Sequence, residues 1–107
     1  MEHLNIPAEF KFMGRTWQVK PGTVQELGTD LGQCRQDEYT IYLSPSYPDQ
    51  RVIATLFHEL VHVWETELNL HLTEDQVDNI SVAMTHWFKE NPEFIPLLVD
   101  DLEFEQE

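Results

Sequence analysis

The segment Gln50–Asn69 constrains the fold of this chain more than any other, because it has the pattern of one long helix and contains an H-E-x-x-H motif. On an α-helix, residues four apart are turned by about 40° and separated by about 6 Å along the axis. His58 and His62 therefore point to the same side, where two imidazoles can bind one Zn²⁺. Glu59 lies on the flank of this pair, too far round to bind the metal but close enough to reach a metal-bound water.

Apolar residues cover most of the circumference of this predicted helix. At about 100° per residue, the broad apolar face consists of Ile53, Leu56, Phe57, Leu60, Trp64 and Leu68. Val61 and Val63 extend this face on both sides and leave a thin polar stripe almost opposite. That stripe consists of Arg51, Thr55, His58, His62, Glu65 and Asn69. A surface helix normally has a wide charged face, so this pattern predicts a buried helix with a polar cleft along one side.

The composition is typical of one globular domain. A chain of 107 residues with 41% hydrophobic residues can form a single core. Six Lys and Arg stand against 20 Asp and Glu, and with a net charge of −14 we expect no binding to nucleic acid or to an anionic membrane. Cys34 is the single cysteine, which excludes an intramolecular disulfide and a thiolate metal cluster. No signal peptide or membrane segment is evident, so we expect a cytoplasmic protein.

Two hairpins are expected in the first half of the chain. The predicted strands are residues 10–13, 16–20, 31–36 and 39–44, paired in that order. A tight turn at Gly14-Arg15 joins the first pair, and residues 36–38 join the second. In the last of these strands Ile41 and Leu43 alternate with polar residues, which is the period of a half-buried strand.

A loop should separate these strands from the long helix, since Pro45 and Pro48 exclude both a sheet ladder and a helix. Asp49 is then a suitable N-cap for the long helix. Further along, Thr73 and Gln76 form a capping box, which predicts the start of a second helix.

The second helix should run to about Glu90 and pack roughly antiparallel against the first, because the connection between them is short. A short third helix is predicted at residues 94–99. We therefore expect one α+β domain, with a small N-terminal antiparallel sheet packed on the motif-bearing helix and on a second, ligand-bearing helix. The expected limits are 1–48 for mainly strands, 49–99 for helices and 100–107 for an acidic tail.

A catalytic zinc ion normally takes three protein ligands, so a third is needed beside the two histidines. The longer motif with a glycine and a third histidine is excluded, because Glu65 and Leu68 stand at those positions. Asp78 is our predicted third ligand, since it lies one turn inside the second helix and should face the middle of the first. Glu74, Glu65 and His71 remain alternatives.

Three further residues are candidates for orienting a ligand or contacting a substrate: Glu65, His86 and Tyr42. Glu65 shares the polar stripe with both histidines, but it lies about 10 Å along the axis from His58. His86 lies two turns beyond Asp78 and is equally typical of a partly buried residue between helices.

The segment HELVHVWETELNLHLTEDQVDNIS resembles the gluzincin arrangement of zinc metallopeptidases, in which an acidic residue of a second helix follows the motif. The most similar groups are the minimal gluzincins and small phage-type metallopeptidases related to the ImmA/IrrE group. The resemblance covers residues 50 to 90. It implies that His58, His62 and Asp78 bind zinc and that Glu59 is the general base. The family usually has Glu as third ligand, so Asp78 would be a departure.

The resemblance also implies an antiparallel sheet whose edge strand binds an extended substrate by strand addition, and residues 39–44 are the candidate edge strand. We therefore expect a zinc-dependent metallopeptidase that acts on a peptide or protein substrate. The alternative is a non-catalytic zinc-binding regulatory or adaptor protein with a relic site. A further hypothesis is that the acidic tail, or the run 94–99, folds across the cleft and makes the enzyme latent.

Overall fold

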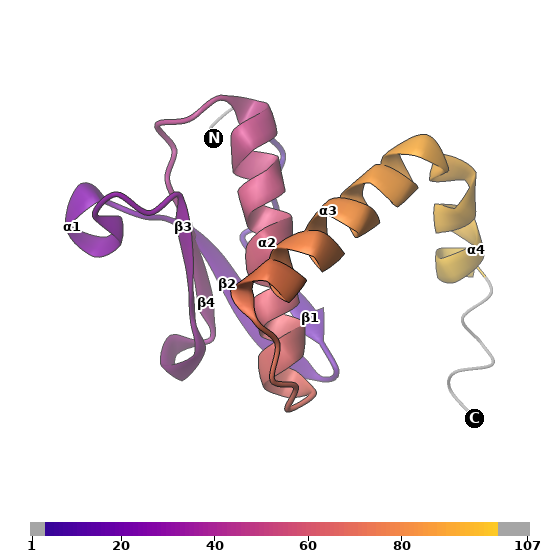
Figure 1. The fold of residues 1–107 in the computed structure, drawn as a ribbon, viewed down its shortest axis with the longest axis horizontal. Coiled ribbons are helices and arrows are strands. Elements are labelled where there is room, and N and C mark those ends of the chain that lie inside the picture. Colours follow the sequence, from indigo (N-terminus) through magenta and orange to yellow (C-terminus); the bar gives the residue numbers. More distant parts are fainter. Residues whose placement is uncertain (1–3, 101–107) are drawn as a thin grey trace.

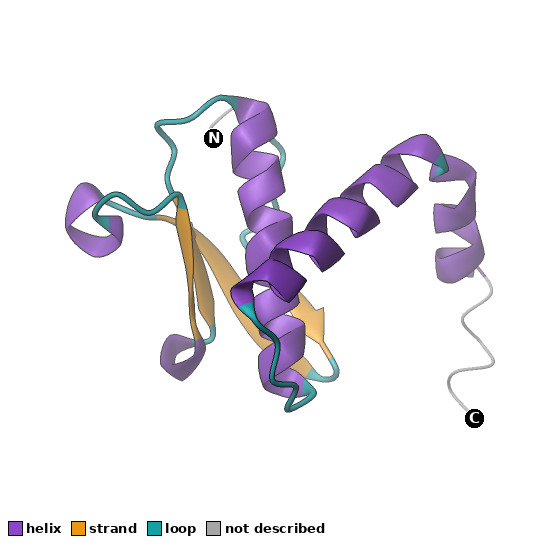
Figure 2. Cartoon of the chain, viewed as in Figure 1, coloured by secondary structure: helices purple, strands orange, loops and turns teal. Residues whose placement is uncertain are grey.

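The body of the protein is a four-stranded sheet with a long helix, α2, packed across one face (Figure 1). The computed structural model describes residues 4–100. The strands and the short helices among them are β1 (Glu9–Phe12), β2 (Arg15–Pro21), α1 (Val24–Leu27), β3 (Gly32–Arg35), the 3-10 turn η1 (Gln36–Glu38) and β4 (Thr40–Leu43). The remaining helices are α2 (Asp49–Glu67), α3 (Glu74–Glu90), the 3-10 turn η2 (Pro92–Phe94) and α4 (Ile95–Asp100). Strands precede the main helices along the chain (Figure 2), which confirms the α+β class.

Both predicted hairpins are present. β1 and β2 pair antiparallel with Phe12 opposite Arg15, so Met13 and Gly14 form a two-residue turn. Both turn residues have positive φ, at 50° and 87°, as the tightest hairpin turns require. β3 and β4 also pair antiparallel, and η1 joins them.

The sheet is mixed, however, and the prediction of an antiparallel sheet is wrong. The strand order is β1-β2-β4-β3, and β2 pairs parallel with β4. After β2 the chain passes through α1 and β3, and it then returns so that β4 lies between β2 and β3. β4 is therefore a central strand, and the expectation that residues 39–44 form an edge is also wrong. The edge strands are β1 and β3.

β4 is buried on both faces, contrary to the half-buried pattern expected from its alternation. The Tyr42 ring lies beneath the Arg35 guanidinium at 4.8 Å, and its hydroxyl donates to Glu38 Oε1 at 2.8 Å. The Thr40 hydroxyl donates to the Glu38 carbonyl at 2.9 Å. Thr40 and Tyr42 can thus be buried, because their hydroxyl groups form hydrogen bonds with Glu38 of the same hairpin.

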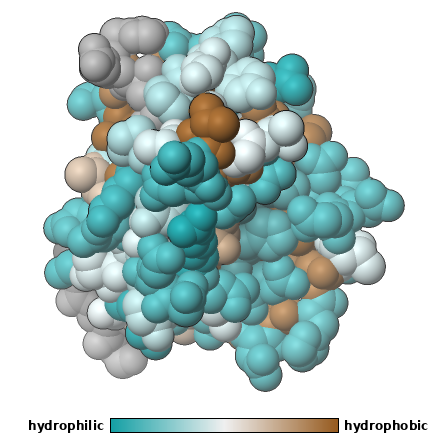
Figure 3. Space-filling view, turned by 90° about the vertical axis from the view of Figure 1, so that its left-hand side faces the viewer, coloured by the Kyte–Doolittle hydropathy of each residue, from teal (hydrophilic) through white to brown (hydrophobic). Residues whose placement is uncertain are grey.

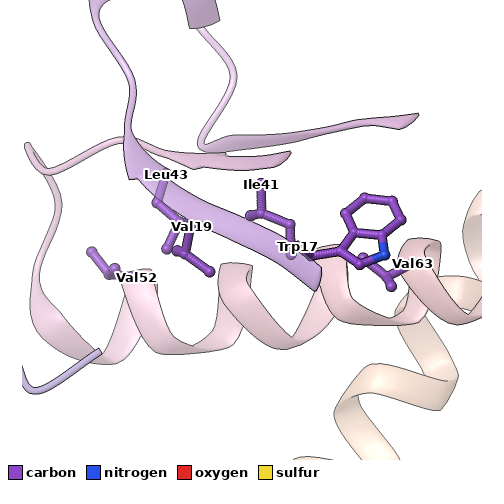
Figure 4. Close-up of a cluster of buried hydrophobic side chains, with 6 residues drawn as sticks. All are labelled: Trp17, Val19, Ile41, Leu43, Val52 and Val63. Carbon is purple, nitrogen blue, oxygen red and sulfur yellow. The ribbon is translucent and has the colours of Figure 1, made fainter. Parts of the chain in front are cut away.

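The core lies between the sheet and α2 (Figure 4). It is formed by Trp17, Val19, Ile41, Leu43, Val52 and Val63. The burial of α2 differs from the expected apolar face, because Ile53 and Leu68 are 39% and 47% exposed while Val61 and Val63 are fully buried. Since the sheet covers one side of α2 and α3 only a part of another, burial follows these contacts rather than the helical periodicity alone.

The helix starts agree with the predictions to within a residue. α2 begins at Asp49, with Pro48 at the N-cap position. α3 begins at Glu74 with the predicted capping box: the Gln76 N–H donates to Thr73 Oγ1 at 3.1 Å, and the Thr73 N–H donates to Gln76 Oε1 at 2.9 Å. Within residues 4–100, no helix is long and apolar enough to cross a membrane.

α3 does not lie along α2 for its full length, as the expected antiparallel packing would require. The N-terminal part of α3 contacts α2, and the rest of α3 leads away from the body, so that α4 stands apart from the sheet (Figure 1). Only Val77 and Ser81 of α3 are buried. This crossing decides which residues of α3 reach the histidines.

Candidate metal centre

Three side chains from two helices converge beside α2. His58 and His62 lie one turn apart on α2, and Glu74 is the first residue of α3. Glu74 Oε1 is 3.4 Å from His58 Nε2, and Glu74 Oε2 is 3.2 Å from His62 Nε2. One ligand atom from each residue lies within 4.8 Å of the others, so this His–His–Glu group could hold a metal ion. Two imidazole nitrogens and one carboxylate are a donor set that suits catalytic zinc.

Asp78, the predicted third ligand, lies one turn further along α3 and outside this group. Its Oδ1 is 3.6 Å from His58 Nδ1, whereas Glu74 lies beside the other ring nitrogen of His58, Nε2. The crossing of α3 over α2 explains the difference: the N-terminal residue of α3, rather than a residue one turn inside, meets the histidine pair. Glu74 was the alternative from the same face of α3, and the capping box at Thr73 was the sequence pattern that marked it as the first helical residue.

Glu65 connects the metal centre to the loop between the two helices. Its Oε1 is 3.0 Å from His62 Nδ1, and its Oε2 accepts a hydrogen bond from the Leu72 N–H at 2.9 Å. These two contacts hold the pKa of the Glu65 carboxyl below its usual range, with the Leu72 hydrogen bond as the larger cause. Each histidine therefore has one nitrogen toward Glu74 and the other toward a second carboxylate, Asp78 or Glu65.

We expect Glu65→Gln to destabilise the metal-free protein at neutral pH. Because the pKa of this carboxyl is lowered in the folded state, its contribution is present above the unfolded-state pKa and is lost as the pH falls through the folded-state value. The difference in the free energy of unfolding between wild type and variant should therefore shrink in acid. Urea unfolding at neutral pH and at a pH below the ordinary carboxyl value of 4.5 measures it. Glu90→Gln, at the exposed far end of α3, is the control. A difference that does not change with pH would contradict this role.

Glu59 is the exceptional residue of α2, because it is buried as a whole while its carboxylate lines the cleft without a hydrogen-bond partner. Only 7% of the residue is exposed, and it makes no hydrogen bond or ion pair with any residue in the described part of the chain. Burial raises the pKa of the Glu59 carboxyl, and the neighbouring His62 and His58 oppose that rise. A partly desolvated carboxylate without a hydrogen-bond partner costs stability. Such a group is typical of a site where chemistry, rather than stability, requires it.

His58, Glu59 and His62 line a cleft of about 790 Å³ between α2 and the edge strand β3. One wall consists of Gly32, Gln33 and Cys34 of β3, and Glu74 and Asp78 belong to α3. β3 comes close to α2 at Gly32, where a Cβ atom would lie 2.7 Å from Thr55 Cγ2. The face of the molecule on the α1 and β3 side is largely hydrophilic (Figure 3). The role of β3 in this wall was not predicted, because nothing in its sequence identifies it as an edge strand.

Cys34 lies in this wall and pairs with the core residue Ile41 in the sheet register. Burial raises the pKa of the Cys34 thiol to about 12, and the charges of Glu59 and Glu65 add to the effect. Because the thiolate is the nucleophile, native metal-free protein should react with iodoacetamide at pH 8 about 10³-fold more slowly than the protein unfolded in guanidinium. Mass spectrometry over time measures both rates. Equal rates would show that the thiol is not held in this environment.

The other predicted site residues lie outside this cleft. Tyr42 is buried in the sheet against Arg35 and Glu38. His71 is exposed in the connection between the helices, and His86 lines a separate groove on α3. The run 94–99 does not line the cleft, so the hypothesis that it covers the site is not supported by the fold, and residues 101–107 lie outside the described range.

The geometry therefore brings together His58, Glu59, His62 and, from the alternatives, Glu74, with Asp78 and Glu65 behind the two histidines. Comparison of the chain with protein-family models, with curated proteins and with solved structures gives no match.

Proposed function

We propose that this protein is a zinc-dependent metallopeptidase. The observation that carries the proposal is the convergence of His58 Nε2, His62 Nε2 and the Glu74 carboxylate next to the buried, unpartnered Glu59. A structural zinc site needs no base beside its ligands. The combination of an incomplete ligand set and a free carboxylate is typical of a site that keeps room for water and substrate.

In this proposal His58, His62 and Glu74 hold the zinc ion, in place of the set with Asp78 that the sequence favoured. The bound ion would polarise the scissile carbonyl and lower the pKa of the attacking water. Glu59 accepts the proton of that water and passes it to the leaving amine. The raised pKa of Glu59 suits the first part of this exchange, because a carboxylate with a raised pKa is a stronger base and accepts the proton of water more readily.

The Nδ1 atom of each histidine lies beside a carboxylate other than Glu74. Glu65 lies 3.0 Å from His62 Nδ1, and Asp78 lies 3.6 Å from His58 Nδ1. A carboxylate beside Nδ1 favours the imidazole tautomer that is protonated at Nδ1. Nε2 is then unprotonated and can bind a metal ion. Asp78 and Glu65 are thus proposed as residues that orient the ligands.

The proposed substrate is an extended peptide that binds along β3. This strand pairs with β4 on one side, and within residues 4–100 no strand pairs with its other side. Residues 32–34 of β3 line the cleft that contains the histidines. A peptide added as a further strand would pass over the proposed zinc site.

The first experiment measures bound metal per chain by elemental analysis, on protein purified without chelators or a histidine tag. The expected result is about one zinc ion per chain, together with cleavage of members of a peptide library. Absence of metal, even after zinc is added, would contradict the proposed site, because deprotonated ligands at these distances should bind it.

A non-catalytic zinc-binding regulatory or adaptor protein is the second candidate. The observation that favours it is the set of exposed apolar residues of α4, a helix that lies far from α2 and β3 (Figure 1). Stoichiometric zinc without cleavage of any library peptide would favour this candidate over the peptidase.

A further inference from the structure

The C-terminal part of the described chain projects from the body with its apolar residues exposed. This arm, residues 87–99, comprises the end of α3, η2 and α4 (Figure 1). Trp87, Phe94, Ile95, Leu97, Leu98 and Val99 are between 42% and 65% exposed. The Trp87 and Phe94 rings contact each other at 4.9 Å, which makes the bend between α3 and α4 a defined corner.

Such an arm needs a partner surface. A helix of six residues is marginal in water by itself, because its few hydrogen bonds do not offset the cost of nucleation. α4 packs chiefly on η2, and the body of the protein covers little of it. Ile95, Leu98 and Val99 have the i, i+3, i+4 spacing with which a short amphipathic helix enters a groove.

A groove of suitable size lies where α2 and α3 diverge. It has a volume of about 310 Å³ and is lined by Gln50, Ile53, Ala54, Thr85, His86 and Lys89. Ile53 is 39% exposed there, although its position on α2 predicts a core residue. The groove is lined by residues of α2 and α3, whereas α4, at the far end of α3, leads away from α2 (Figure 1).

The charges of the two surfaces are complementary. The groove contains Lys89 and His86 and no acidic residue, which is unusual for a chain with 20 acidic and six basic residues. The arm beyond Lys89 contains Glu90 and Glu93 and no basic residue. An arm that carries the apolar residues of α4 behind the acids Glu90 and Glu93 therefore fits the groove better than most of the surface of this protein.

We propose that the groove between α2 and α3 receives α4 of a second copy of this chain, and that the exchange is reciprocal. A two-fold axis then gives two identical contacts, in which each copy supplies one arm and one groove. The contact buries Leu98 and Ile53 together and brings Glu93 near Lys89 of the other copy. This proposal does not rest on peptidase activity or on zinc.

Sedimentation equilibrium of the full chain over a wide concentration range tests the proposal. The expected result is a dimer, at twice the chain mass of 12.6 kDa, that Leu98→Glu and Ile53→Lys each dissociate to monomer. Val24→Glu is the matched control, since Val24 is 81% exposed on α1 and distant from both surfaces. It should remain dimeric.

Mixing the two monomeric variants distinguishes an arm–groove contact from unfolding. Leu98→Glu keeps an intact groove and Ile53→Lys keeps an intact arm, so the mixture retains one native contact and gains a Glu–Lys pair in the other. It should form a heterodimer. The proposal is overturned if the wild type stays monomeric at every concentration. That result is expected if the arm folds back into the groove of its own chain, or if a different protein occupies the groove. The proposal is equally overturned by variants that remain dimeric, or by a mixture that stays monomeric.

Discussion

Glu59→Gln is expected to lower the rate of peptide hydrolysis by at least about 10²- to 10⁴-fold, the contribution of a general base. The amide preserves the size and position of the side chain but cannot accept the proton of the attacking water. Cleavage of a library-selected peptide by zinc-loaded protein, with zinc content measured on the same samples, tests this. The variant should retain its zinc, since Glu59 lies outside the His–His–Glu group.

The stability of the same variant separates a catalytic role from a structural one. Burial raises the pKa of Glu59, so the folded state favours the protonated carboxyl and loses stability as the pH rises through the folded-state pKa. A neutral glutamine avoids this loss. Metal-free Glu59→Gln should therefore be at least as stable as wild type at neutral pH, as urea unfolding can show. Asp75→Asn, at an exposed position of α3, should change neither activity nor zinc content. Normal hydrolysis by Glu59→Gln would exclude Glu59 as the base.

The second large effect is expected from Glu74→Ala, which should weaken zinc binding far more than Asp78→Ala does. Glu74 Oε1 and Oε2 lie 3.4 and 3.2 Å from the two histidine nitrogens, so its removal deletes one of the three proposed ligands. Asp78 reaches only His58 Nδ1, and loss of a residue that orients a ligand costs about 10- to 100-fold in metal affinity. Competition with a chromophoric chelator measures both affinities.

Two controls make this comparison decisive. His62→Ala should abolish zinc binding in either scheme, which shows that the assay detects ligand loss. The unfolding transitions of the metal-free variants should resemble that of wild type, because both acidic side chains are about two-thirds exposed. The opposite order of effects would identify Asp78 as the ligand. Glu74 would then be an acid that only stabilises the start of α3, as acids in a first helical turn often do.

Local features of the chain were predictable where a few neighbouring residues determine the geometry. The spacing of His58 and His62 places them on one side of any helix, whatever surrounds it. The Thr73 and Gln76 capping box marks the start of α3 for the same reason, since both partners lie within one turn. Gly14 gives the first hairpin its turn, because its positive φ is accessible without strain.

Long-range packing, by contrast, decided the order of the strands and which carboxylate of α3 lies beside the two histidines. Whether β4 lies at an edge depends on the path of the chain through α1 and β3, and no pattern within residues 40–43 encodes that path. Whether Glu74 or Asp78 reaches the histidines depends on how α3 crosses α2. The two residues share one face of α3 and differ by one turn, about 6 Å along the axis.

The sequence by itself thus determined a helix with two histidines and a flanking glutamate, two hairpins and a capped second helix, since these depend on interactions between residues close in the chain. Only the tertiary structure decided that β3 forms the wall of the cleft, that Glu74 joins the histidines and that Glu59 is buried without a partner. These features arise from contacts between segments distant in the chain, whose relative placement depends on the packing of the whole domain.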